Sequence, residues 1–206
     1  DVGQDPASAS VDLDCTIVVV SGLPRAGTSM IMQMLQAGGL PVLTDDRRPA
    51  DEDNPRGYFE FEPVKRLPRE REWLNGARGR AVKVVSPLLE GLDFTFSCRV
   101  LLIERRLEEV IASQRAMLDR RGRQGAALSD DRLRAVFKSQ SGRARRLLSE
   151  RGVPHLLVEH GACLAAPLAT ARRINAFLGG GLDEKAMAAA VLPALHRRRA
   201  GCGSGR

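Results

Sequence analysis

The sequence predicts an α/β fold in which helices cover both faces of a parallel β-sheet. Four short apolar runs alternate with longer segments whose apolar residues recur at helical spacing. Continuous apolar runs are typical of parallel strands that are covered on both faces, whereas half-exposed strands alternate apolar and polar residues. We expect these strands at residues 16–20, 81–85, 99–103 and 154–158.

The expected helices lie between and after these strands. Residues 28–37 place four apolar side chains on one stripe, and residues 107–119 repeat the pattern. Residues 130–151 predict a long charged helix, and residues 168–178 predict another that ends before three consecutive glycines. The two stripes consist of Met30, Ile31, Met34 and Leu35, and of Val110, Ile111, Met117 and Leu118.

Two segments, residues 44–57 and 120–127, are rich in turn-forming and charged residues and are predicted to be loops. Loops at strand ends of α/β folds usually bind substrates, so we expect specificity to reside in residues 44–57 and 120–130. A chain of 206 residues with 43% hydrophobic content fits a single domain, residues 1–206. Residues 1–14 and 200–206 are expected to be its flexible ends.

The charge of the chain indicates an anionic ligand. The formal net charge is +7, but the basic residues are spread along the sequence rather than gathered in one block. Proteins that read nucleic acids usually add aromatic stacking platforms, and aromatic residues make up only 4% of this chain. We therefore expect a small anionic ligand and neither a nucleic-acid nor a membrane partner, and the oligomeric state stays open.

The cysteines predict free thiols in a reducing compartment. They lie far apart, without a C-x-x-C pair or a neighbouring histidine cluster, and no metal site is expected. No apolar run is long enough to span a bilayer, and residues 1–14 lack the regions of a signal peptide. These features predict a cytoplasmic protein. The four cysteines are Cys15, Cys98, Cys163 and Cys202.

A glycine loop joins the first expected strand to the first helix in the stretch IVVVSGLPRAGTSM, residues 17–30. Gly22 and Gly27 have the spacing of a nucleotide-binding P-loop, but Thr28 stands where an NTPase has lysine. The N–H groups of such a loop and the helix dipole attract phosphate, and Arg25 adds a cation. We expect a P-loop NTPase-like three-layer fold, with a phosphate-binding segment of Pro24, Arg25, Ala26, Gly27, Thr28 and Ser29.

A second anion site is expected after the third strand. Arg105 follows that strand, and Ser113 lies about two turns into the next helix. In a parallel sheet both residues can lie at the same edge as the glycine loop. Two phosphate sites at one edge predict a nucleotide that is phosphorylated at both ends.

These residues carry a family resemblance. The G-x-P-R-x-G-T-S loop resembles the 5′-phosphosulfate-binding loop of sulfotransferases that use 3′-phosphoadenosine 5′-phosphosulfate (PAPS). Arg105, followed eight positions later by Ser113, is similar to the 3′-phosphate motif of that family. Over residues 17–199 the chain also resembles bacterial sulfotransferase-like proteins in the segments MLQAGGLP, NPRGYFEFEPVKRL, VKVVSPLL, ERRLEEVIASQ and AFLG.

The resemblance implies a reaction and roles for residues. PAPS is the implied sulfuryl donor, adenosine 3′,5′-bisphosphate the product, and a hydroxyl or amine of a small molecule or glycan the acceptor. Neither a P-loop lysine nor a metal is obligatory for this donor. Arg25 is expected at the bridging oxygen of the donor. Lys83 is similar to a lysine of tyrosyl-protein sulfotransferase-like enzymes and is expected to assist the leaving group.

The general base has several candidates. Family members place a glutamate or histidine after the first helix and second strand, where this chain has Asp45, Asp46, Glu60 and Glu62. We favour Glu60, because its flanking aromatic residues are expected to desolvate it and raise its proton affinity. Asp46 is its main rival, and His160 is a further candidate.

The chain departs from the family at one place. Many soluble sulfotransferases add a late G-x-x-G-x-x-K loop over the 3′-phosphate, and this motif is absent from the sequence, although Arg197 and Arg199 offer a substitute. Two other functions stay open. One is an ATP-dependent P-loop kinase, which the missing lysine disfavours, and the other is a nucleotide-binding module without catalysis.

Overall fold

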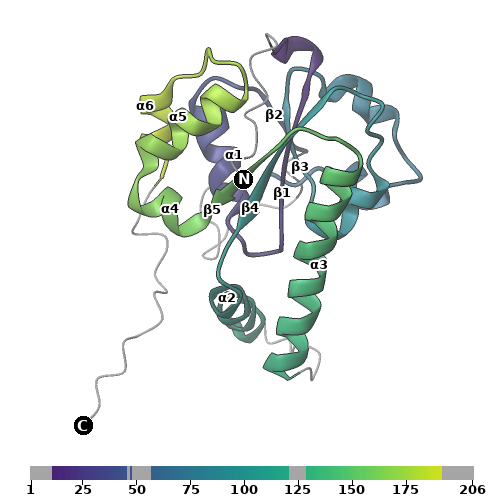
Figure 1. Ribbon diagram of the computed structural model, residues 1–206, viewed down its shortest axis with the longest axis vertical. Coiled ribbons are helices and arrows are strands. Elements are labelled where there is room, and N and C mark those ends of the chain that lie inside the picture. The colour runs from purple at the N-terminus through teal and green to yellow at the C-terminus, as the bar shows by residue number, and fades with distance from the viewer. Residues whose placement is uncertain (1–10, 46, 48–56, 121–128, 192–206) are drawn as a thin grey trace.

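A five-stranded, fully parallel sheet forms the centre of the protein (Figure 1). The computed structural model describes residues 11–45, 47, 57–120 and 129–191. The strands lie in the order β2-β3-β1-β4-β5. Their bounds are Ile17–Gly22 for β1, Val42–Leu43 for β2, Ala81–Lys83 for β3, Cys98–Glu104 for β4 and His155–Glu159 for β5.

Strand β1 lies in the middle of the sheet and is buried along its whole length. Val20 pairs with Lys83 on one side and with Leu101 on the other. The chain first builds β2 and β3 on one side of β1 and then β4 and β5 on the other. Such a reversal of strand order opens a crevice at the carboxyl ends of the strands, where ligands of α/β proteins bind. The loop after β1 therefore lies at that crevice.

Two helical layers cover the sheet, as Figure 1 shows with the sheet between them. Alternate residues of β1 separate the two cores, because Val18 and Val20 face one side and Ile17 and Val19 face the other. The first face packs against α1 (Thr28–Ala37), α4 (His160–Ala165), α5 (Pro167–Phe177) and α6 (Glu184–Ala189). The second packs against α3 (Asp130–Glu150) and the 3-10 helices Glu62–Arg66, Glu72–Ala77 and Ser86–Gly91.

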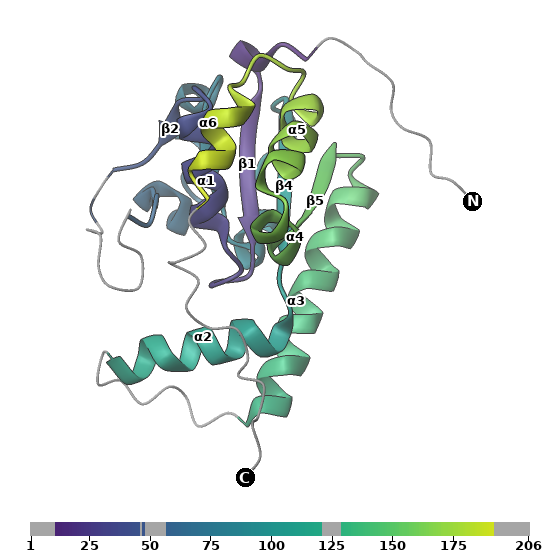
Figure 2. The ribbon, with the colours of Figure 1, turned by 90° about the vertical axis from the view of Figure 1, so that its left-hand side faces the viewer.

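Helix α2 (Leu107–Arg120) runs crosswise beyond the carboxyl ends of the strands (Figure 2). Its apolar side is anchored by Val110, which is fully buried in the core on the α1 side. Ion pairs join it to α3, with 3.4 Å between Glu108 and Arg134 and 2.5 Å between Arg115 and Asp130. The polar side chains of α2 are thus carried to the same end of the molecule as the loop after β1.

The structure confirms the predicted α/β fold, and α1 occupies the predicted residues. Strand β2 and helices α4 and α6 were not predicted. The expected flexible ends fall largely outside the described residues, although Leu13–Cys15 forms a 3-10 helix. None of the described helices is both long and apolar enough to cross a membrane.

Candidate phosphate-binding site

The loop after β1 is a tight turn that leads directly into α1. The N–H of Ala26 donates to the carbonyl of Leu23 at 3.0 Å, and Gly27 forms the N-cap of α1 with φ at +105°. Arg25 also adopts a positive φ of +71°. The first N–H groups of α1 have no partner within the helix and lie at the positive end of its dipole. The loop thus leads to backbone N–H groups at the positive end of a helix dipole, at the position where the sequence predicts phosphate binding.

Both glycines of the loop are required by close neighbours. A Cβ atom at Gly22 would lie 2.8 Å from the carbonyl oxygen of Ile103 on β4. A Cβ atom at Gly27 would lie 2.6 Å from Cδ2 of His160. The two glycines of the G-x-x-x-x-G spacing thus mark two close contacts, one of Gly22 with β4 and one of Gly27 with α4.

His160 forms part of the support of this loop. It begins α4 directly after β5, and only 2% of its surface is exposed. Its imidazole ring packs against Gly27, as the close approach described above shows. An acceptor in solvent does not reach a ring at this depth, so the position of His160 suits packing better than proton transfer.

Helix α2 and the residues before it hold Arg25 from two directions. The Nη1 atom of Arg105 donates to the carbonyl oxygen of Arg25 at 3.2 Å. Ser113 accepts a hydrogen bond from Nε of Arg25 at 3.0 Å. The structure therefore brings the two predicted anion sites together at one residue of the loop. These contacts also explain how Arg25 keeps a backbone conformation that non-glycine residues rarely adopt.

Lys83 reaches the site from the end of β3. Its Nζ atom donates to Oγ of Ser29 at 3.3 Å and to the carbonyl oxygen of Tyr58 at 2.8 Å. An ammonium group thus lies at the first turn of α1, although the loop itself lacks a lysine. Lys83 and Arg25 contact different serines, Lys83 through Ser29 of α1 and Arg25 through Ser113 of α2.

Glu60 does not have the apolar enclosure that the sequence suggested. Phe59 packs into the core on the α1 side, whereas Phe61 packs on the opposite side of the sheet beside Trp73. The carboxylate forms an ion pair with Lys65 at 3.1 Å, and 22% of its side chain is exposed. Hydrogen bonds to Glu62 and to Glu60 raise the pKa of Lys65. The flanking aromatic residues therefore do not enclose Glu60 as the sequence analysis expects, and the carboxylate lies beside the ammonium group of Lys65.

The other carboxylates of this region serve the local backbone. Asp45 accepts hydrogen bonds from the N–H groups of Glu62 at 2.7 Å and Arg47 at 3.2 Å. Burial opposes its charged form, but these two hydrogen bonds together with the charges of Arg47 and Lys65 outweigh burial, so the pKa of Asp45 lies below its ordinary value. A lowered pKa makes Asp45 a weak base. Glu62 pairs with Lys65, and Asp46 lies outside the described residues.

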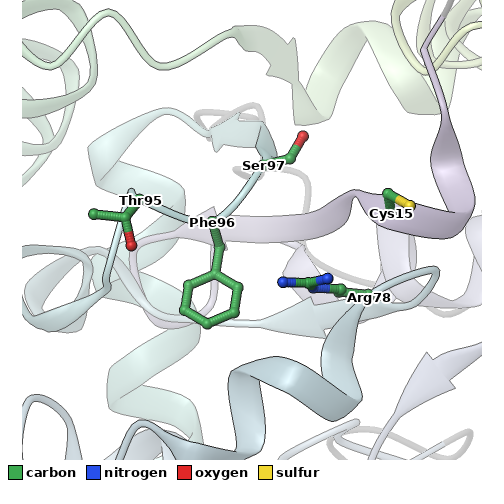
Figure 3. Close-up of a pocket in the computed structure, with 5 residues that line it drawn as sticks. All are labelled: Cys15, Arg78, Thr95, Phe96 and Ser97. Atoms are coloured by element: carbon green, nitrogen blue, oxygen red, sulfur yellow. The ribbon is translucent and has the colours of Figure 1, made fainter.

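A separate depression of about 310 Å³ lies at the end of the sheet where the strands begin, and Figure 3 shows the residues that line it. The guanidinium of Arg78 stacks over the ring of Phe96 at 5.5 Å. A hydrogen bond with Asp12 raises the pKa of the Cys15 thiol, which keeps it protonated. This depression adjoins the amino ends of β1 and β4, away from the glycine loop, and is not part of the candidate site. It is lined by Cys15, Arg78, Thr95, Phe96 and Ser97.

Two contacts of the site escaped the sequence analysis. The carbonyl of Tyr58 binds both Lys83 and the Ser29 hydroxyl, but a backbone oxygen leaves no signal in residue types. Glu109 forms an ion pair with Arg105 at 2.9 Å. The spacing of four residues between them is the available signal for that pair.

Comparison with known proteins adds a distant likeness among solved structures. No protein-family model matches the chain, and no curated protein matches it. Among solved structures, the chain is similar to the sulfotransferase domain of the olefin synthase from Synechococcus PCC 7002, with 17% sequence identity and a TM-score of 0.49. The match covers 84% of this chain and 75% of the other.

Proposed function

We propose that this chain is a PAPS-dependent sulfotransferase that acts on a hydroxyl or amine of a small molecule or glycan. The observation that carries the proposal is the double contact at Arg25, which joins a phosphate loop to the Arg105 and Ser113 pair. A nucleotide with a phosphate at each end suits a site of this kind. PAPS supplies an activated sulfuryl group together with a 3′-phosphate.

The donor end of the proposed site consists of the loop and the start of α1. The backbone N–H groups after Gly27 and the hydroxyls of Thr28 and Ser29 are suited to bind the 5′-phosphosulfate. Gly22 and Gly27 allow the loop to pack closely against Ile103 and His160, because neither position carries a Cβ atom. Arg105 and Ser113 are suited to bind the 3′-phosphate.

Two cations of the chain are suited to stabilise the charge that develops during transfer. In the reaction the sulfur–oxygen bond to the bisphosphate breaks, a bond from sulfur to the acceptor oxygen or nitrogen forms, and the acceptor proton passes to a base. Negative charge grows on the bridging oxygen in a loose transition state. We assign Lys83 to this oxygen, because Lys83 contacts Ser29. Arg25, which the sequence analysis expects at the bridging oxygen, is assigned instead to the space between the two phosphates, because its Nε atom donates to Ser113.

Glu60 is the base that we propose. Glu60 lies close in sequence to the cation site. Tyr58, two residues before Glu60, accepts a hydrogen bond from Lys83 through its backbone carbonyl. Glu60 pairs with the exposed side chain of Lys65, whereas two backbone N–H groups occupy the carboxylate of Asp45.

The experiment that tests this function follows a radiolabelled sulfuryl group. The full chain is incubated with sulfur-labelled PAPS and a panel of simple alcohols, amines and glycans, and the acceptors are then analysed for label. We expect label on at least one acceptor class with release of an equal amount of adenosine 3′,5′-bisphosphate. Arg105→Ala serves as the impaired control. Transfer of label from γ-labelled ATP with magnesium, and none from PAPS, would contradict the proposal and indicate a kinase.

A further inference from the structure

Three polar residues recur at intervals of four around the start of α2, and the first and third contact the glycine loop. Arg105 precedes the helix, and Glu109 and Ser113 follow one and two turns later. Residues at this spacing lie on one side of a helix. Arg105 and Ser113 both contact Arg25 of the loop, and Glu109 lies between them in the sequence. The carboxylate of Glu109 is therefore beside the predicted 3′-phosphate site.

The guanidinium of Arg105 is fixed by two hydrogen bonds of different origin. Its Nε donates to Oε2 of Glu109 at 2.9 Å, and its Nη1 donates to the carbonyl of Arg25 at 3.2 Å. Only 12% of the Arg105 side chain is exposed, against 26% for Glu109. A planar group held at two of its nitrogens has a fixed orientation, and its other N–H groups keep fixed directions.

Two opposing effects of Glu109 on an incoming phosphate have to be weighed. The carboxylate repels a second anion, which weakens binding. It also orders a long side chain in advance, so that less rotamer entropy is lost when the phosphate binds. The second effect is expected to dominate, because Arg105 is largely buried and is held by two hydrogen bonds, so most of its rotamer entropy is lost before the phosphate binds.

We propose that Glu109 is a positioning residue that holds Arg105 ready for the 3′-phosphate of the nucleotide. The inference rests on the proposed function and deepens it by naming what sets the preference for nucleotides with a 3′-phosphate. Glu109 acts through Arg105 and does not contact the ligand itself. Its effect is therefore confined to one end of the nucleotide.

The test compares two ligands that differ only in that end. Titration calorimetry measures the Kd of adenosine 3′,5′-bisphosphate and of adenosine 5′-monophosphate for the full chain and its variants. In Glu109→Ala we expect the preference for the bisphosphate to fall about tenfold, with the monophosphate Kd unchanged. Glu109→Gln keeps an oxygen that accepts from Nε of Arg105, and we expect it to retain most of the preference.

Glu108→Ala is the matched control. This neighbouring glutamate pairs with Arg134 of α3 at 3.4 Å, and 59% of its side chain is exposed. Its removal is expected to leave both Kd values unchanged, and thermal unfolding of each variant checks that the fold is kept.

Three results would overturn the inference. The first is an unchanged preference in Glu109→Ala, and the second is an equal loss of affinity for both nucleotides, which indicates a general structural role. The third is an equal loss of preference in the alanine and glutamine variants, since the hydrogen bond would then not orient Arg105. A wild-type chain without preference for the bisphosphate would overturn the proposed function together with the inference. The three results above overturn only the role of Glu109, so failure of the inference can be told from failure of the proposed function.

Discussion

Lys83→Ala is expected to lower the rate of sulfuryl transfer by a factor of about 100 to 1,000. Lys83 places its ammonium at the first turn of α1, beside Ser29. We assign it to the bridging oxygen, where negative charge grows only as the bond breaks. Loss of a group that acts mainly in the transition state lowers kcat more than substrate affinity. Initial rates with PAPS and the acceptor found in the labelling screen measure this effect.

Binding of the unreacted donor separates catalysis from structure at Lys83. The Kd of PAPS, measured without an acceptor, is expected to change by no more than about threefold in Lys83→Ala, because the negative charge on the bridging oxygen grows only as the sulfur–oxygen bond breaks. Lys138→Ala, which removes an exposed lysine from α3, is the control for charge alone. A parallel loss of PAPS affinity would show that Lys83 holds the nucleotide or the Tyr58 segment rather than assisting the reaction. An unchanged rate would remove Lys83 from the mechanism.

Gly27→Ala is expected to destabilise the fold by about 2–5 kcal/mol and to abolish nucleotide binding. The new side chain would carry two costs. One is the positive φ of +105°, which L-residues rarely adopt, and the other is the contact of Cβ with Cδ2 of His160 at 2.6 Å. Urea unfolding measures the stability, and titration with adenosine 3′,5′-bisphosphate measures the binding.

Gly39→Ala separates these two costs. Gly39 has a similar φ of +95°, but nothing lies within 4 Å of a Cβ atom at this position. We expect it to cost only the backbone term, about 1–2 kcal/mol. In the double variant Gly27→Ala, His160→Ala, the removal of the ring is expected to recover part of the loss. Equal costs for the two glycine variants, without recovery in the double variant, would contradict the packing of His160 against the loop.

The elements predicted from the sequence are the long or strongly patterned ones. Helix α1 was predicted at its observed bounds because Met30, Ile31 and Met34 mark a buried stripe before Gly38. Strand β2 contains two residues, and helices α4 and α6 contain six each. Segments of this length are too short to show a hydrophobic period, and they form because the surrounding core places them.

In the candidate site as well, some features could be predicted from residue types and others could not. The glycine spacing and the pair of Arg105 and Ser113 are patterns of residue types, and the structure brings them together at Arg25. The surroundings of Glu60 depend on Phe59, whose positive φ of +51° no residue pattern indicated. The aromatic neighbours therefore pack into two different cores instead of around the carboxylate. The expected enclosure of Glu60 failed because it depended on backbone conformation, which the residue types do not indicate.

The most direct test of a site for two phosphates is titration calorimetry of the full chain with adenosine 3′,5′-bisphosphate, beside magnesium-ATP. We predict tight binding of the bisphosphate that does not depend on magnesium and that weakens about 100-fold in Arg105→Ala, since a charge-assisted contact is lost. Preferential binding of magnesium-ATP, or a bisphosphate affinity that is unaffected by Arg105→Ala, would contradict the account.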